Sequence, residues 1–129
     1  MFGSQIYDSV VVSLDHDPGP DDVIYVWRAP KACEVKSAYA STSNAVAADA
    51  TNYFDVALYN GAAAGTAITL ISGTVGGTAG WTALLPVAFT MTTTGKNLAA
   101  GDVVTLKYNE NGTGTFTHMI VQLDVQYGT

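Results

Sequence analysis

The sequence predicts an all-β protein, a single-domain antiparallel β-sandwich that is jelly-roll-like and has about eight strands. Three observations predict it. Apolar residues recur at every second position in short runs, the runs are rich in Val, Ile, Tyr and Thr, and Gly, Pro, Asn or Asp bound each run. No run shows the 3.6-residue period of an amphipathic helix.

The candidate strands alternate closely enough to assign their two faces. They run from Tyr7 to Leu14, Asp22 to Ala29, Ala32 to Ser41, Asn52 to Asn60, Thr66 to Ser72, Pro86 to Thr92, Asp102 to Asn109 and Phe116 to Gly128. The predicted core positions are Phe54, Val56, Leu58, Val104, Leu106, Tyr108, Met119, Val121, Leu123 and Val125. The second run is apolar at both parities, so we expect that strand to be covered on both faces.

Two connections need an interpretation. The Ala-rich stretch from Ser43 to Thr51 favours a loop, with one helical turn capped by Asn44 as the alternative. The stretch from Ile71 to Pro86 contains too many glycines for regular structure, and we expect it to carry Trp81 over one open end of the sandwich.

The length of 129 residues fits one domain around one core, residues 1–129. Within it, residues 1–12 would form either an N-terminal arm or a first edge strand. The start, MFGSQIYDS, has no basic region ahead of an apolar core, so it does not predict a secretion signal, and no apolar stretch reaches the length of a membrane span.

The net charge of the chain disfavours some classes of binding partner. Eleven acidic and five basic side chains give a net charge of −6, which disfavours nucleic acid and anionic membranes. Charged residues make up only 12% of the chain, and such a bland surface suggests that another protein covers part of it. The single cysteine, Cys33, excludes an intramolecular disulfide and is expected to be a small buried apolar side chain.

Titratable residues cluster in the stretch LDHDPGPDD. Its carboxylates are those of Asp15, Asp17, Asp21 and Asp22. The prolines stiffen the chain and the spacing departs from that of a calcium-binding loop, so a rigid solvated turn is favoured, with a divalent-cation site as the alternative.

No other pattern predicts catalysis or a cofactor. His118 has outward parity because Met119 points inward, and no nucleophile, phosphate-loop or dinucleotide motif accompanies it. In Gly101-Asp102, the glycine and the carboxylate serve a tight corner that leads into a strand. We therefore expect no enzyme activity, no cofactor and no firm metal site.

The aromatic residues suggest a possible sugar-stacking surface, made by Tyr53, Tyr59 and Trp81. The sequon Asn111-Gly112-Thr113 fits the tip of a hairpin and is interpreted as a turn.

The stretches WRAPKACEVKSAYAS, DATNYFDVALYNG, GWTALLPVAFTM, KNLAAGDVVTLKY and THMIVQLDVQY follow one another from Val23 to Tyr127. In this order and spacing the chain resembles the small β-sandwich virion proteins of tailed bacteriophages, which are decoration (cement) proteins of the head or minor structural proteins. The resemblance implies a non-enzymatic, oligomeric protein, with a trimer favoured, on the capsid surface with the major capsid protein as partner.

The resemblance also assigns structural roles to turn residues. They are Asp49, Thr51, Asn52 and Tyr53 at the start of the fourth strand, and Gly101 and Asp102 at the start of the seventh. The alternative function is a carbohydrate- or receptor-binding module of a head fibre or tail, based on the aromatic residues.

Overall fold

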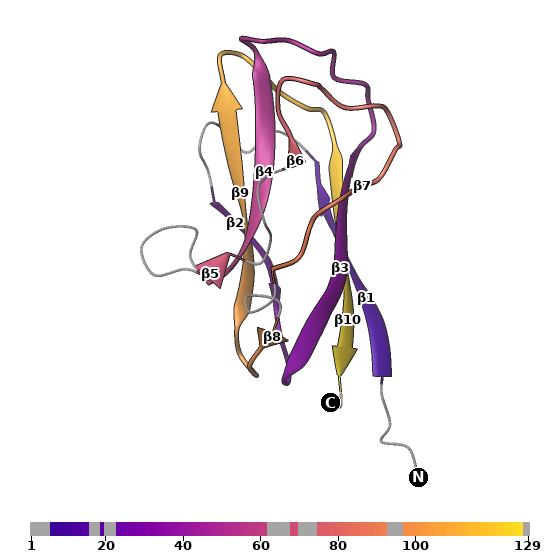
Figure 1. Cartoon of the computed structure of the whole chain (residues 1–129), viewed down its shortest axis with the longest axis vertical. Helices are drawn as coiled ribbons and strands as arrows, with labels where there is room; N and C mark the ends of the chain where they lie inside the picture. The colour runs from indigo at the N-terminus through magenta and orange to yellow at the C-terminus, as the bar shows by residue number, and fades with distance from the viewer. Residues whose placement is uncertain are drawn as a thin grey trace.

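The computed structural model describes residues 6–15, 19, 23–61, 68–69, 75–92 and 97–127. These residues form an antiparallel β-sandwich, and Figure 1 shows its two layers, one with β2, β4 and β9 and the other with β1, β3 and β10. The strands are β1 (Ile6–Leu14), β2 (Val23–Arg28), β3 (Cys33–Thr42), β4 (Tyr53–Asn60), β5 (Ile68–Thr69), β6 (Val75–Gly76), β7 (Val87–Ala88), β8 (Asn97–Leu98), β9 (Val103–Asn111) and β10 (Met119–Tyr127). The predicted fold class is confirmed.

The strand pairing is nested. Sheet A has the order β1-β10-β3-β7, with β8 also on β3, and sheet B has the order β2-β9-β4-β5, with β6 also on β4. The first strand thus pairs with the last, the second with β9, the third with β7 and β8, and the fourth with β5 and β6. A chain doubled over on itself and then rolled into two sheets produces this pattern, which is a jelly roll.

The core lies between the two sheets, where inward positions alternate with polar outward ones. All ten predicted core side chains are buried. Each contributes about 1.5–3 kcal/mol by leaving water, which opposes the loss of backbone freedom. Cys33 is buried as expected, and burial, with a further contribution from the Asp102 carboxylate, raises the pKa of its thiol.

An aromatic cluster fills the core where β4 begins. The Phe54 ring stacks on Trp81 with a centroid distance of 5.4 Å and also contacts Tyr108 and Phe116 at 5.4 and 5.3 Å. Trp81 is held there by a backbone pairing with Val46 in the connection between β3 and β4. The glycine-rich stretch therefore brings a large ring into the core instead of across its surface.

Three expectations about local structure were wrong. The strand β2 has an exposed outer face at Val23 and Tyr25, because it is an edge strand and its pairing with β9 shifts between Tyr25 and Trp27. The last strand begins at Met119, because Phe116 belongs to the crossover between the sheets. The Asn111 turn likewise joins β9 in sheet B to β10 in sheet A and is not a hairpin tip.

Two other segments differ from the predicted secondary structure or are described only in part. Of the predicted strand from Thr66 to Ser72, Ile68–Thr69 is described as β5 and the remainder lies outside the described residues. The stretch 43–51 contains no helix, and Asn44 accepts a hydrogen bond from the Thr117 backbone through its side chain instead of capping a helical turn. None of the described residues belongs to a helix that could cross a membrane.

Candidate functional site

The acidic stretch is described only in part. Asp15 follows β1, and its carboxylate lies 3.7 Å from His118 Nε2, whereas Asp17, Asp21 and Asp22 lie outside the described residues. Among the residues that the structure describes, no three His, Cys, Asp or Glu side chains gather as metal ligands. The two interpretations of this stretch, a rigid turn and a cation site, both stay predictions.

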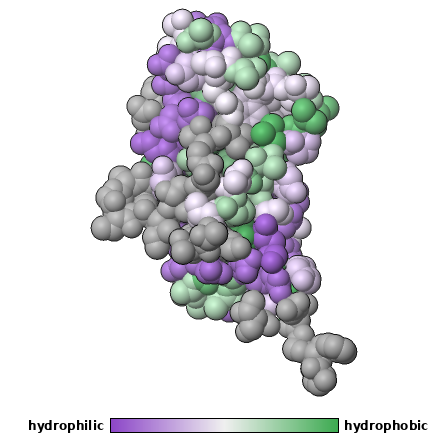
Figure 2. Space-filling view, in the orientation of Figure 1, coloured by the Kyte–Doolittle hydropathy of each residue, from purple (hydrophilic) through white to green (hydrophobic). Residues whose placement is uncertain are grey.

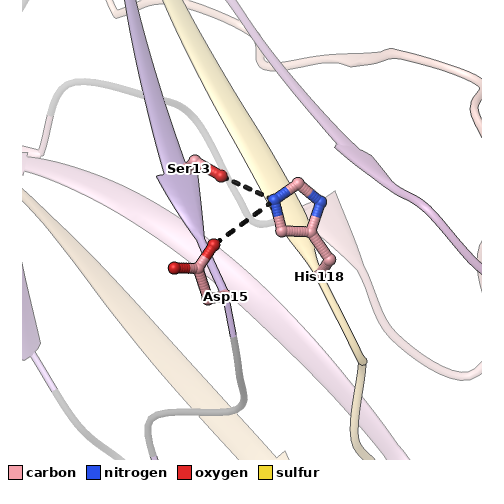
Figure 3. Close-up of polar contacts among 3 residues, drawn as sticks. All are labelled: Ser13, Asp15 and His118. Carbon is pink, nitrogen blue, oxygen red and sulfur yellow. Dashed lines mark hydrogen bonds and ion pairs between the residues drawn. The ribbon is translucent and has the colours of Figure 1, made fainter.

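Figure 3 shows a hydroxyl, an imidazole and a carboxylate together at the end of β1. Ser13 Oγ lies 2.5 Å from His118 Nε2, the same nitrogen that faces Asp15. In a serine hydrolase triad the carboxylate binds the other ring nitrogen, so that the imidazole can relay a proton from the hydroxyl. Here both partners share one nitrogen, and the contact therefore serves to join the end of β1 to the residue that precedes β10.

The Gly101-Asp102 corner uses its polar groups to hold the chain. Gly101 has a φ of 91° and donates its N–H to the Ala29 carbonyl at 2.8 Å. Asp102 Oδ2 accepts hydrogen bonds from the Ala99 backbone at 2.8 Å and from Asn60 Nδ2 at 3.0 Å. The carboxylate thus closes the turn before β9 and ties it to the end of β4.

The Asp49 carboxylate organises the start of β4. Its Oδ1 accepts the backbone N–H groups of Thr51 at 2.8 Å and Asn52 at 2.9 Å, and these hydrogen bonds lower the pKa of Asp49. Asn52 Oδ1 in turn accepts the Thr113 N–H at 2.9 Å, and Tyr53 begins the strand. The turn therefore also anchors the crossover from β9 to β10.

The three aromatic residues predicted as a binding surface do not share one. Trp81 is only 5% exposed, because its ring packs into the core against Phe54, and this part of the prediction is wrong. Tyr53 and Tyr59 are half-buried on β4 and lie six positions apart along the strand, a distance of about 20 Å. One sugar ring cannot contact both.

A polar cluster that the sequence did not reveal lies on the outer face of sheet A. The Asp124 carboxylate accepts hydrogen bonds from Ser9 and Ser37 at 2.8 Å and from Gln122 at 2.9 Å. These hydrogen bonds, that from Gln122 foremost, lower the pKa of Asp124. Alternation placed Asp124 outward, but only the order β1-β10-β3 brings its donors together.

Exposed apolar side chains also lie on this face, some next to the Asp124 cluster and some in a separate groove. Tyr7 and Val11 on β1 are 65% and 58% exposed, and Ile120 on β10 is also exposed. Leu84, 75% exposed, lies beside Ile120 in a groove of about 260 Å³. Figure 2 shows hydrophobic surface at the right-hand edge of the molecule, near the chain that leads into β7 in Figure 1.

The backbone conformation of Leu84 keeps its side chain exposed to solvent. It has a φ of 61°, a left-handed conformation that costs a non-glycine residue about 1–2 kcal/mol. Its N–H nevertheless bonds to the Thr42 carbonyl at 2.8 Å, so the turn is fixed to β3. An exposed leucine in a strained and anchored turn is the kind of feature found at binding surfaces.

No model of a protein family matches the chain, and no curated protein matches it in sequence. The structure of infectious bursal disease virus, Gx strain, contains a chain that is 11% identical, with a TM-score of 0.29, over 95% of this chain and 41% of the viral one. The Gt strain structure gives 11% identity, a TM-score of 0.26, and coverage of 96% and 42%. This chain thus spans about two fifths of either viral chain.

Proposed function

We propose that the chain is a virion structural protein, and in particular a decoration protein that binds the head of a tailed bacteriophage. The observation that carries the proposal is the outer face of sheet A. Exposed Tyr7 and Val11 lie on either side of Ser9, which bonds to the Asp124 carboxylate, and exposed Ile120 and Leu84 line a separate groove further along the same face. Exposed large apolar side chains interspersed with polar ones are typical of protein–protein contacts.

The proposed partners are the major capsid protein and further copies of this chain. A protein that binds only the assembled shell stabilises it by mass action, and this requires no catalytic residues. The rigid sandwich suits such a role, because the outer faces can be buried without changing the core. The resemblance to phage decoration proteins supports a place on the capsid surface, and it supports a trimer as the assembled form.

The test is binding to phage heads. Heads purified from the phage that encodes the chain, and stripped of it, would bind the added protein in a sedimentation assay, and electron cryo-microscopy would place it over the head lattice. The double variant Leu84→Ser with Ile120→Ser would weaken binding by about a hundred-fold or more, since the two lost side chains together contribute about 3 kcal/mol when buried.

A matched control removes exposed apolar groups from the other sheet. Val23→Ser with Tyr25→Ser alters the outer face of β2 to a similar extent and would leave head binding unchanged. Density at the tail tip, or binding to glycans with no binding to heads, would contradict the proposal and favour a receptor-binding module.

A further inference from the structure

The outer edge of sheet A is formed by β1, whose free side we name the β1 edge (residues 6–14, the side away from β10). This strand is nine residues long and pairs with β10 without a register shift. Among the described residues, no strand pairs with its other side. Natural edge strands are usually shortened, bulged, or protected by Lys or Pro. The β1 edge has no Lys or Pro, and its one charged side chain is Asp8.

The other long edge strand shows such protection. β2 is six residues long, its pairing with β9 is shifted between Tyr25 and Trp27, and it ends in Arg28. β1 has exposed large apolar residues, as β2 does, but it has neither a shifted register nor a basic end. The β1 edge is therefore the one on which an added strand would fit.

Hydrogen bonds in the interior of sheet A show which backbone groups face that edge. The Ala38 carbonyl accepts the Phe89 N–H, so this even-numbered residue of β3 faces away from β10. Ser43, of odd number, donates its N–H to the His118 carbonyl that precedes β10. In antiparallel strands alternate residues pair to opposite sides, so the even-numbered residues of β10 pair with β3 and the odd-numbered ones with β1.

This parity extends to β1. Val10 faces Leu123 and Val12 faces Val121, so both residues bond to β10. The N–H and C=O groups of Val11 and Ser13 then point to the β1 edge, where no described residue pairs with them. They are donors and acceptors in position for another strand.

The Ser9 backbone agrees with this assignment, because its N–H donates to the neighbouring Asp8 carboxylate at 2.9 Å instead of to β10. A hydrogen bond from an edge N–H to a neighbouring side chain is weaker and more exposed than a hydrogen bond to an adjacent strand. The Ser9 N–H can therefore donate to the backbone of an added strand instead.

We propose that the β1 edge binds the β1 edge of a second copy of this chain, antiparallel and across a two-fold axis. The outward-pointing groups belong to odd-numbered residues, so odd must face odd. Complete overlap of residues 6–14 then places Val10 opposite the partner's Val10. The two A sheets would join into one continuous sheet across the axis.

The side chains are compatible with this register. On the outer face Ser9 meets the partner's Val11, and Tyr7 meets the partner's Ser13. Asp8 faces the partner's Val12, and the two Asp8 carboxylates lie about 14 Å apart, beyond the Debye length of about 8 Å at physiological salt. Each copy carries a net charge of −6, so the contact has to use a strip almost free of charge, as the β1 edge is.

The area of an edge-to-edge contact is small, so we expect a dissociation constant on the order of 10 μM to 1 mM. The contact would supply a self-association that goes beyond the proposed function, in which the assembled form is a trimer. A variant that loses it can still be assayed on heads, so the two proposals can fail separately. A two-fold contact also differs from the three-fold assembly that the resemblance implies.

The test combines sedimentation with residue-resolved amide exchange of the full chain. Dimers would form as the concentration rises, and more salt would strengthen them because it screens the like charges. Exchange at Val11 and Ser13 would slow with concentration. Exchange at Val10 and Val12, which bond to β10, would stay constant and serves as the internal control.

The variant Val11→Pro removes one outward donor without touching the β10 ladder, which an edge strand tolerates. Two-fold symmetry removes the donor twice, so dimerisation would weaken by about ten-fold or more. Val11→Thr, which keeps the N–H and the branched shape, would dimerise like the parent. Circular dichroism would confirm that both variants fold.

Three results would overturn the proposal. They are a strict monomer up to about 1 mM with unchanged exchange at Val11, a trimer that Val11→Pro leaves intact, and protection of Val11 that appears only when heads are added. The last result would assign the edge to a strand of the capsid instead of a second copy. If Val11→Pro fails to fold, the concentration dependence of exchange in the parent decides.

Discussion

The hydroxyl of Tyr108 should stabilise the crossover between the two sheets, and Tyr108→Phe tests this. The Tyr108 ring is fully buried against Phe54 and Phe116, and its hydroxyl donates a hydrogen bond to the Gly114 carbonyl at 2.9 Å. Gly114 lies in the crossover from β9 to β10, close against the Tyr53 backbone. The substitution keeps the ring and removes this buried hydrogen bond, together with a longer contact of 3.5 Å from the same hydroxyl to Glu110 Oε1.

The expected loss of unfolding free energy depends on the Gly114 carbonyl, which the substitution leaves without the Tyr108 donor. The lost bond itself contributes about 1 kcal/mol net, and a buried carbonyl left without a donor adds a desolvation penalty, which gives about 1.5–3 kcal/mol in all. A chain of 129 residues has an unfolding entropy of about 0.27 kcal/mol/K near its midpoint. Tyr108→Phe should therefore lower Tm by about 6–11 °C.

Urea unfolding followed by circular dichroism measures the difference in unfolding free energy, and calorimetry gives Tm. The control is Tyr25→Phe, because the Tyr25 side chain is 60% exposed and its loss of a hydroxyl should change stability by less than about 0.5 kcal/mol. A Tyr108→Phe effect as small as that of the control, with an unchanged m-value, would refute the claim that this hydroxyl fastens the crossover.

Three further predictions concern other parts of the chain. Hydrogen bonds lower the Asp124 pKa in the folded state, so this carboxylate stabilises the fold above its unfolded pKa near 4, and the stabilisation is lost as pH falls below that value; Asp124→Asn should reduce the pH dependence of the free energy of unfolding, measured with urea, below about pH 4. Gly80→Ala should cost more than about 3 kcal/mol, since a Cβ would clash with the Val46 carbonyl at a φ of 76°, whereas Gly61→Ala meets no atom within 4 Å and should cost only about 1–2 kcal/mol. Trp81→Phe should cost under about 1 kcal/mol by thermal unfolding, because it removes a buried indole N–H that has no partner among the described residues, whereas Trp81→Ala should cost about 3–5 kcal/mol.

The sequence predicted the core because the long strands have one buried and one polar face. In β4, Phe54, Val56 and Leu58 alternate with half-buried or small residues, and a period of two admits one assignment of faces. The same reasoning failed for β2, where both parities are apolar. Apolar side chains on an edge strand can be exposed, and composition does not distinguish an edge from a central strand.

The candidate surface was harder to predict because it depends on pairing between distant residues. Ser9 and Asp124 are separated by 115 positions, and no local pattern indicates that β1 lies on β10. Leu84 could not be singled out either, since its exposure arises from a left-handed turn that the Thr42 carbonyl fixes. For Trp81 the prediction failed in the opposite direction. An aromatic residue in a glycine-rich loop was expected at the surface, and it is buried.

The outer face of sheet A and the β1 edge can contribute to binding in different ways. A sheet face offers side chains, so the Leu84 groove can select a partner by shape and apolar area. A sheet edge offers backbone groups, so the proposed contact of the β1 edge with a second copy depends on strand length, register and low charge. In the nested pairing of a jelly roll the first strand pairs with the last and its far side remains an edge, which makes the edge a product of topology rather than of composition. Mutations on the face should therefore change which partner binds, and mutations on the edge should change whether copies associate.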